Sequence, residues 1–151
     1  MTVVVRLASP VDAAELTQLR FEWSPPPAPA PPAAAPDFAA HLGDWMRRQG
    51  ERYLCTIATA GHEPVGMAWL AVFERVPNAH ERLRLSGDVQ SVYVRPGLRN
   101  QAIGERLVRL LLDEAGRRGV TEFTVHSSEG ALPFYRRLGF VGSDRRLELS
   151  R

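Results

Sequence analysis

The sequence contains one cysteine and no lysine, and these two shortages exclude several kinds of protein. With Cys55 alone, no disulfide, Cys-x-x-Cys redox pair or cysteine-rich zinc site can form within the chain, so we expect a reducing compartment and no metal centre. A lysine-dependent phosphate loop and a pyridoxal Schiff base both need lysine. Because all 19 basic residues are arginines, neither of these sites can form here.

Long apolar runs are also missing. Residues 67–73 form the longest one, which is far shorter than the roughly 20 residues that a membrane span needs. Residues 1–6 lack the apolar stretch of about 7 to 15 residues that marks a secretion signal. We therefore expect a cytoplasmic protein without a membrane partner.

Length and composition predict one globular domain. The chain has 151 residues, of which 44% are hydrophobic and 24% charged, and a domain typically has roughly 100 to 200 residues. The net charge is only +2, and the arginines occur as scattered pairs such as Arg117-Arg118, which are typical of solvated surface. Nucleic acid is therefore not an expected partner.

Proline is concentrated in one segment. Residues 24–36 hold seven of the 12 prolines, which remove backbone donors and favour an extended chain. Only about 23 residues precede the segment, too few for a core of their own. We interpret it as a stiff loop within a single domain covering residues 1–151. A proline-rich ligand for a partner domain is the alternative.

Hydrophobic periodicity and turn signals predict an α/β fold. We expect a mixed, mostly antiparallel sheet of about seven strands with about four helices, and a loop at residues 76–87. Because a helix connects the strands at 88–94 and 120–126, these two form a parallel pair. The other predicted strands are 3–7, 53–60, 64–74, 140–141 and 147–149, and the predicted helices are 10–23, 37–50, 102–118 and 131–138.

The turn between the strand at 88–94 and the helix that follows carries the first functional signal. The first N–H groups of a helix lack partners and attract anions. Arg99 adds positive charge there, while Ala102 and Gly104 leave the backbone accessible. On its own this pattern fits a phosphate site or a helix-capping turn without a ligand.

A second segment decides between these interpretations. Ala131-x-x-x-Tyr135-x-x-x-Gly139-Phe140, taken with the turn at Arg99–Gly104, resembles the GNAT superfamily of acyl-CoA-dependent N-acetyltransferases. The turn matches that family's Arg/Gln-x-x-Gly/Ala-x-Gly/Ala pyrophosphate loop. The order of the predicted strands and helices also matches the family's.

The resemblance implies a binding mode for acetyl-CoA. In that family the ligand occupies a gap where two parallel strands splay apart, here 88–94 and 120–126, and pantetheine pairs like an added strand. The implied contacts are the backbone of Val92, Tyr93 and Val94, with the Val92 N–H on the thioester oxygen, and Ser128 near pantetheine. The pyrophosphate loop would comprise Arg99, Asn100, Gln101, Ala102, Ile103 and Gly104.

Four positions depart from the family's pattern. Ala102 stands where glycine is commonest, and if that position needs a positive φ, alanine costs roughly 1 kcal/mol or more. Asn100 and Gln101 make the loop less basic. Ser128 replaces a longer asparagine.

Two residues are the predicted catalytic groups. Tyr135 matches the tyrosine whose hydroxyl points at the CoA sulfur, and a phenol with a pKa of about 10 is protonated at neutral pH. Asp88 lies where the histone acetyltransferase branch has its glutamate base. Glu22, His126 and a water chain are alternative bases.

Three other residues each have two interpretations. Cys55 is either a buried small apolar residue or an acetyl-accepting nucleophile. Trp23 and Trp45 flank the proline-rich segment, on the side where the family binds acceptors, and serve either core packing or substrate stacking.

The predicted function is acetyl transfer from acetyl-CoA to a primary amine, of a small molecule or a peptide, by direct attack. A longer acyl-CoA as donor is one alternative. A non-catalytic acyl-CoA-binding sensor or interaction module is another. We also expect that the chain can form a homodimer, because such domains often pair through sheet edges or their last strands.

Overall fold

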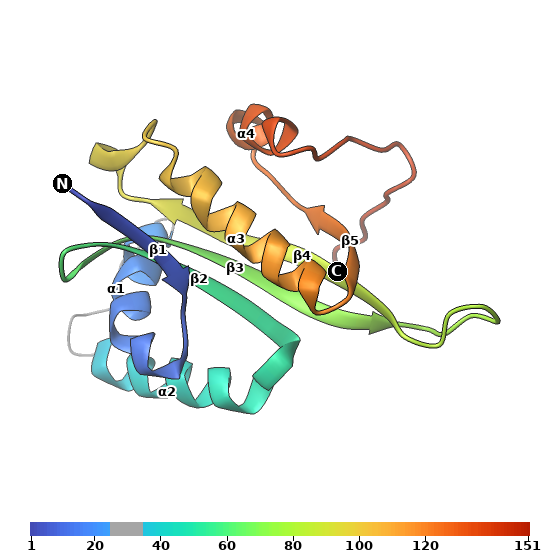
Figure 1. Ribbon diagram of the computed structural model, residues 1–151, viewed down its shortest axis with the longest axis horizontal. Coiled ribbons are helices and arrows are strands. Elements are labelled where there is room, and N and C mark those ends of the chain that lie inside the picture. Colours follow the sequence, from blue (N-terminus) through green and yellow to red (C-terminus); the bar gives the residue numbers. More distant parts are fainter. Residues whose placement is uncertain (25–34) are drawn as a thin grey trace.

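The computed structural model describes residues 1–24 and 35–151, which form a twisted sheet with helices on both faces (Figure 1). β1 to β4 are antiparallel, and β5 runs parallel to β4. The predicted parallel pair is therefore confirmed. The five strands lie side by side in chain order: β1 (Val3–Leu7), β2 (Tyr53–Ala60), β3 (Glu63–Arg75), β4 (Arg84–Val94) and β5 (Val120–Val125).

Helices in the described part lie close to their predicted positions. None of them has the length and apolarity to cross a membrane. Short 3-10 turns precede α1 and α4, at Pro10–Asp12 and Glu129–Ala131. The α-helices are α1 (Ala13–Trp23), α2 (Ala35–Gln49), α3 (Ile103–Arg117) and α4 (Leu132–Arg137).

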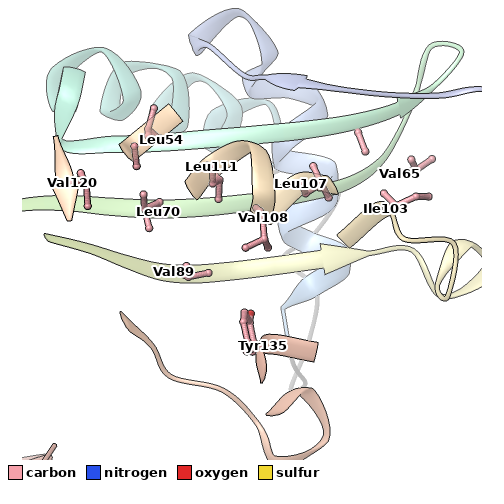
Figure 2. Close-up of a cluster of buried hydrophobic side chains, with 13 residues drawn as sticks. Leu54, Val65, Leu70, Val89, Ile103, Leu107, Val108, Leu111, Val120 and Tyr135 are labelled. Carbon is pink, nitrogen blue, oxygen red and sulfur yellow. The ribbon is translucent and has the colours of Figure 1, made fainter. Parts of the chain in front are cut away.

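Strand alternation divides the core into two layers. Successive residues of a strand point to opposite faces, so Leu54 and Ala58 of β2 pack with α3, whereas Cys55 and Ile57 pack with α1 and α2. Figure 2 shows the α3 layer, with Tyr135 at its margin beyond β4. Fully burying one such leucine or isoleucine contributes about 1.5–3 kcal/mol.

An ion pair between the exposed Arg6 and the buried Asp12 fixes the start of α1 against β1. Oδ1 of Asp12 lies 2.6 Å from Nη2 of Arg6, and its Oδ2 accepts the Ser9 N–H at 2.8 Å. The hydrogen bond from Arg6 holds the pKa of the Asp12 carboxyl below its usual range. The pair thereby orients α1, whose last two turns lie beside the end of β4.

β4 separates from β5 while it is still paired with β3. The last pair of the parallel ladder is Val89 with Val125, but the antiparallel ladder continues to Val94, opposite Gly66. The register with β3 shifts around Gln90, which is a β-bulge, and a bulge bends the strand that carries it. Within the described residues, the end of β4 therefore has a strand neighbour on one side only.

The predicted sheet of about seven strands is wrong, because the described residues form five. Residues 140–141 and 147–149 are not in strands. Each run is too short to make more than a few ladder hydrogen bonds, and Val141 and Leu147 are 90% and 91% exposed. Their apolar character indicated strands, but apolar residues without a covering partner do not stabilise one.

Two predicted loop boundaries also need correction. β4 begins at Arg84, inside the loop predicted at residues 76–87. Its polar first residues are held by pairing with β3 and β5 rather than by propensity. The loop predicted at 24–36 ends earlier, since α2 begins at Ala35. Residues 25–34 of that loop lie outside the described residues.

Candidate active site

A cavity of about 610 Å³ opens where β4 leaves β5. Its walls come from the end of β4, the turn before α3 and the segment around α4. The volume lies within the range of small-molecule sites. The lining residues are Trp23, Val92, Tyr93, Val94, Leu98, Arg99, Asn100, Ala102, Ile103, Gly104, Glu105, Ser128, Gly130, Ala131, Pro133, Phe134, Tyr135 and Arg137.

Most of the predicted site residues lie in this one cavity. Two are not in its wall: Gln101, which is exposed in the turn, and Asp88, which lies further back on β4. The predicted residues that line it are Val92, Tyr93, Val94, Arg99, Asn100, Ala102, Ile103, Gly104, Ser128 and Tyr135.

The turn before α3 presents main-chain amides to the cavity. Ala102 is the N-cap of α3, and both Asn100 and Ala102 adopt left-handed backbone conformations with φ of 63° and 60°. The N–H groups of the first helical turn have no helical acceptor, and the helix dipole adds partial positive charge there. This end of the cavity can therefore bind a phosphate group.

Two arginines add full positive charge at the cavity wall. Arg99 is exposed, and its Nε donates to the Val94 carbonyl at 3.1 Å. One lone pair of that carbonyl is thus occupied by the chain itself. Arg137 also lines the cavity. The sequence analysis missed it because an arginine pair in a short helix has the pattern of ordinary surface.

Tyr135 is held by two aromatic neighbours. Its ring meets Phe134 and Phe140 edge to face, with centroids 5.0 Å and 5.6 Å apart. The residue is 8% exposed, and burial raises the pKa of its phenol. Tyr135 is therefore a neutral hydroxyl donor at physiological pH.

Asp88 is hydrogen-bonded across the parallel pair. Oγ1 of Thr124 donates to its Oδ1 at 2.5 Å, and the two residues are partners in the ladder one position before it ends. The structure therefore places this carboxylate at the closed end of the gap, outside the cavity wall. The alternative His126 lies 3.0 Å from Glu148, at the protein surface.

An ionic cluster lies beside Tyr93. Both carboxylate oxygens of Glu22 accept hydrogen bonds from Arg95, at 3.1 Å and 2.8 Å, and the Tyr93 hydroxyl donates to Glu22 at 3.3 Å. Burial and then the charge of Glu22 raise the pKa of the Tyr93 phenol. Glu22, the second alternative base, is therefore engaged by a cation.

The remaining candidates, Cys55, Trp45 and Trp23, differ in whether they lie in the core or line the cavity. Cys55 is 1% exposed and burial raises the pKa of its thiol, so it is a core residue. Trp45 packs on Tyr53 and Trp69 with centroids 5.3 Å and 6.2 Å apart, whereas Trp23 lines the cavity. In the part of the chain described, no group of three or more His, Cys, Asp or Glu is placed to hold a metal ion.

Comparison with known proteins identifies the class to which this site belongs. Residues 14–140 match the acetyltransferase (GNAT) family. The chain belongs to that family. It is thus an N-acetyltransferase that moves an acetyl group from acetyl-CoA to an amine.

Individual relatives agree in sequence and in fold. The chain is 29% identical over 123 residues to a glucosamine 6-phosphate N-acetyltransferase of Trypanosoma brucei brucei, covering 80% of this chain and 79% of the relative. A glucosamine-6-phosphate N-acetyltransferase of Arabidopsis thaliana superposes with a TM-score of 0.79 at 14% identity, over 100% and 98% of the two chains. A predicted acetyltransferase of Clostridium acetobutylicum, solved with acetyl-CoA, gives 0.73 at 19% identity, over 99% and 96%.

The cavity of this acetyltransferase fits its acetyl donor chemically. A cationic turn with free amides suits a pyrophosphate, and the end of β4, which lacks a second strand neighbour among the described residues, offers main-chain groups to an amide-bearing tail. The sequence analysis expected alanine at position 102 to be costly if its φ is positive, and Ala102 does adopt a positive φ.

Ala102→Gly should therefore stabilise this acetyltransferase by about 1 kcal/mol, since glycine adopts the left-handed region without a Cβ clash. Chemical denaturation measures the change. Ala40→Gly is the matched control, because Ala40 is exposed within α2 and glycine there should cost about 1 kcal/mol. Equal destabilisation of both variants would show that Ala102 is not strained.

Proposed function

We propose that the cavity binds acetyl-CoA and that a primary amine attacks its thioester carbon directly, without a covalent enzyme intermediate. One observation carries this proposal. A phosphate-binding helix start, the separated end of β4 and a buried neutral phenol all line the same cavity.

The donor-binding roles follow from position. The first amides of α3 and the turn residues Arg99 to Gly104 would hold the pyrophosphate, with Arg137 as a second cation. Backbone groups of Val92, Tyr93 and Val94 would hold pantetheine, and the Val92 N–H would polarise the thioester oxygen. A donor aimed at an oxygen that gains negative charge lowers the barrier, typically by about 2.7–4 kcal/mol.

Tyr135 would assist the departure of the thiolate. As the C–N bond forms and the C–S bond breaks, negative charge moves to sulfur and the phenol donates a hydrogen bond to it. Full proton transfer from a phenol to a thiolate is uphill by about 1.5 pKa units, or roughly 2 kcal/mol, and the raised pKa of Tyr135 increases this difference. We therefore assign the residue a hydrogen-bond role.

The amine must lose a proton before it attacks. An alkyl amine with a pKa of about 10.4 costs roughly 4.6 kcal/mol to deprotonate at pH 7. Asp88 is the proposed acceptor of that proton. Its carboxylate lies at the point where the two strands begin to separate, so a water molecule in the gap can connect it to the amine.

The acceptor and the oligomeric state are further parts of the proposal. The relative in Trypanosoma brucei brucei is named for glucosamine 6-phosphate, which makes that amine a first acceptor to test.

We also propose a homodimer through the β5 edge and the chain after Phe140, where Val141, Leu147 and Leu149 are exposed. Sedimentation velocity at micromolar protein tests this, and a monomer would contradict it.

Tyr135→Phe should lower kcat by roughly 10- to 100-fold because the departing thiolate loses its donor. Free thiol released from acetyl-CoA is followed with a panel of amines that includes glucosamine 6-phosphate. Calorimetry should show unchanged acetyl-CoA affinity, since the ring remains in place.

Tyr53→Phe provides the control for that experiment, because Tyr53 packs in the other core layer and should leave kcat unchanged. If acetyl-CoA binds but no amine in the panel releases thiol, the binding module replaces the enzyme. A normal kcat in Tyr135→Phe would remove the role assigned to the phenol.

Asp88→Asn should reduce kcat/KM at pH 7 by roughly 10- to 100-fold. The deficit should shrink as the pH approaches that of amine deprotonation, because free amine then forms without a base. A pH profile of both proteins measures this. Asp113→Asn, an exposed substitution on α3, is the control, and a deficit in Asp88→Asn that does not change with pH would contradict the assignment.

A further inference from the structure

Arg20 is a half-buried arginine near the end of α1, and its guanidinium lies near two indole rings. Its Cζ is 5.2 Å from the ring centroid of Trp23 and 5.8 Å from that of Trp69. Among the described residues, its one side-chain hydrogen bond goes to the Ser91 hydroxyl at 3.4 Å, which is long for such a bond. Burial lowers the pKa of this guanidinium.

Arg20 differs from the other half-buried arginines of the described chain. Arg75, Arg84 and Arg95 each lie within 4.0 Å of a carboxylate, whereas Arg20 has no such partner there. Residues 25–34, outside the described ranges, are all proline or alanine and contain no carboxylate. The chain itself therefore supplies no counter-ion to this cation.

A desolvated cation without a counter-ion is costly, and buried charges are normally paired. The indole faces offset part of this cost through cation–π attraction, worth about 0.5–2 kcal/mol, but most of the five guanidinium donors have no partner among the residues that the structure describes. Planar guanidinium groups bind carboxylates and phosphates through two parallel hydrogen bonds. The free donors of Arg20 therefore suit an oxyanion.

Arg20 lies beside the cavity rather than in its wall, and its neighbours connect it to the end of β4 that lines the cavity. Ser91 immediately precedes Val92, the residue proposed to polarise the thioester, and Trp23 lines the cavity. The nearest acidic residue along α1, Glu22, is already paired with Arg95. No other carboxylate of the described chain lies within ion-pair distance to compete for Arg20.

We infer that Arg20 binds an anionic group, a phosphate or a carboxylate, on the amine that accepts the acetyl group. The inference rests on the proposed function and adds the substrate class: the acceptor carries a negatively charged group besides its amine. Arg20 is thus a specificity residue, and it takes no part in the chemical step.

Paired amines, one with an anionic group and one in which that group is absent or neutral, test this. Glucosamine 6-phosphate is compared with glucosamine, and alanine with alaninamide, so that the phosphate and carboxylate sources are separated. Affinity is measured by calorimetry in the presence of coenzyme A, which needs no turnover, and kcat and KM are measured where thiol is released. The proteins are the wild type, Arg20→Gln, Arg20→Lys and the surface control Arg47→Gln.

In at least one pair, we expect the wild type to bind the anionic member more tightly. Arg20→Gln should weaken the binding of that member by roughly 10- to 100-fold and leave the affinities for its neutral partner and for acetyl-CoA unchanged. Arg20→Lys should keep part of the preference for the anionic member, and the control Arg47→Gln should keep all of it. Each variant is also melted, because a purely structural role would lower Tm and weaken both members of a pair equally.

Several results would overturn the inference: no preference for either anion in the wild type, a preference that survives in Arg20→Gln, or equal loss for charged and neutral amines. The proposed function fails separately. If an Arg20-dependent preference is measured without any thiol release, catalysis is wrong and the anion site stands. If amines are acetylated without regard to charge, catalysis stands and the anion site is wrong.

Discussion

The separation of β4 from β5 is the constraint on which the rest of the site depends. A strand that loses a neighbour exposes N–H and C=O groups that must find other partners. Here the parallel ladder ends at Val89 and Val125 while the ladder with β3 continues to Val94. The same strand leads into the turn before α3, so the unpaired strand edge and the helix amides share one cavity. One deviation in the sheet thus provides both contacts that a long, phosphate-bearing ligand needs.

Local signals made much of this predictable from the sequence. Helical spacing and the cap region placed α3 within one residue at each end, because its amphipathic stripe and its boundaries lie in contiguous residues. The site residues predicted between Val92 and Gly104 came from the family resemblance of one contiguous stretch, and all of them except Gln101 line the cavity. The sequence predicted strain at Ala102 only for the case that its φ is positive. Whether φ is positive depends on how the turn joins β4 to α3, which the structure shows.

The features that escaped prediction depend on contacts between distant segments. Val141 and Leu147 are apolar, yet no strand forms around them, because pairing requires a partner surface that local sequence does not specify. Asp88 points toward Thr124 rather than into the cavity because the register of the parallel pair determines which side chains meet. Arg20 has an ordinary sequence context, and only the packing of α1 on β3 and β4 brings it against Trp69 and Ser91.

The distribution of positive charge would let a nearly neutral chain bind acetyl-CoA together with the anionic acceptor that we propose. A net charge of +2 gives little long-range attraction, so recognition depends on cations placed at particular points. Arg99, Arg137 and the start of α3 form one such point in the cavity wall, and Arg20, hydrogen-bonded to Ser91, is the second point that we propose, for the acceptor. Two ligands of like charge repel each other, and separate cationic groups allow each to bind without bringing their charges together. The phenol of Tyr135, which also lines the cavity, stays uncharged because burial raises its pKa, so in the proposed mechanism it adds no negative charge next to the thiolate that forms.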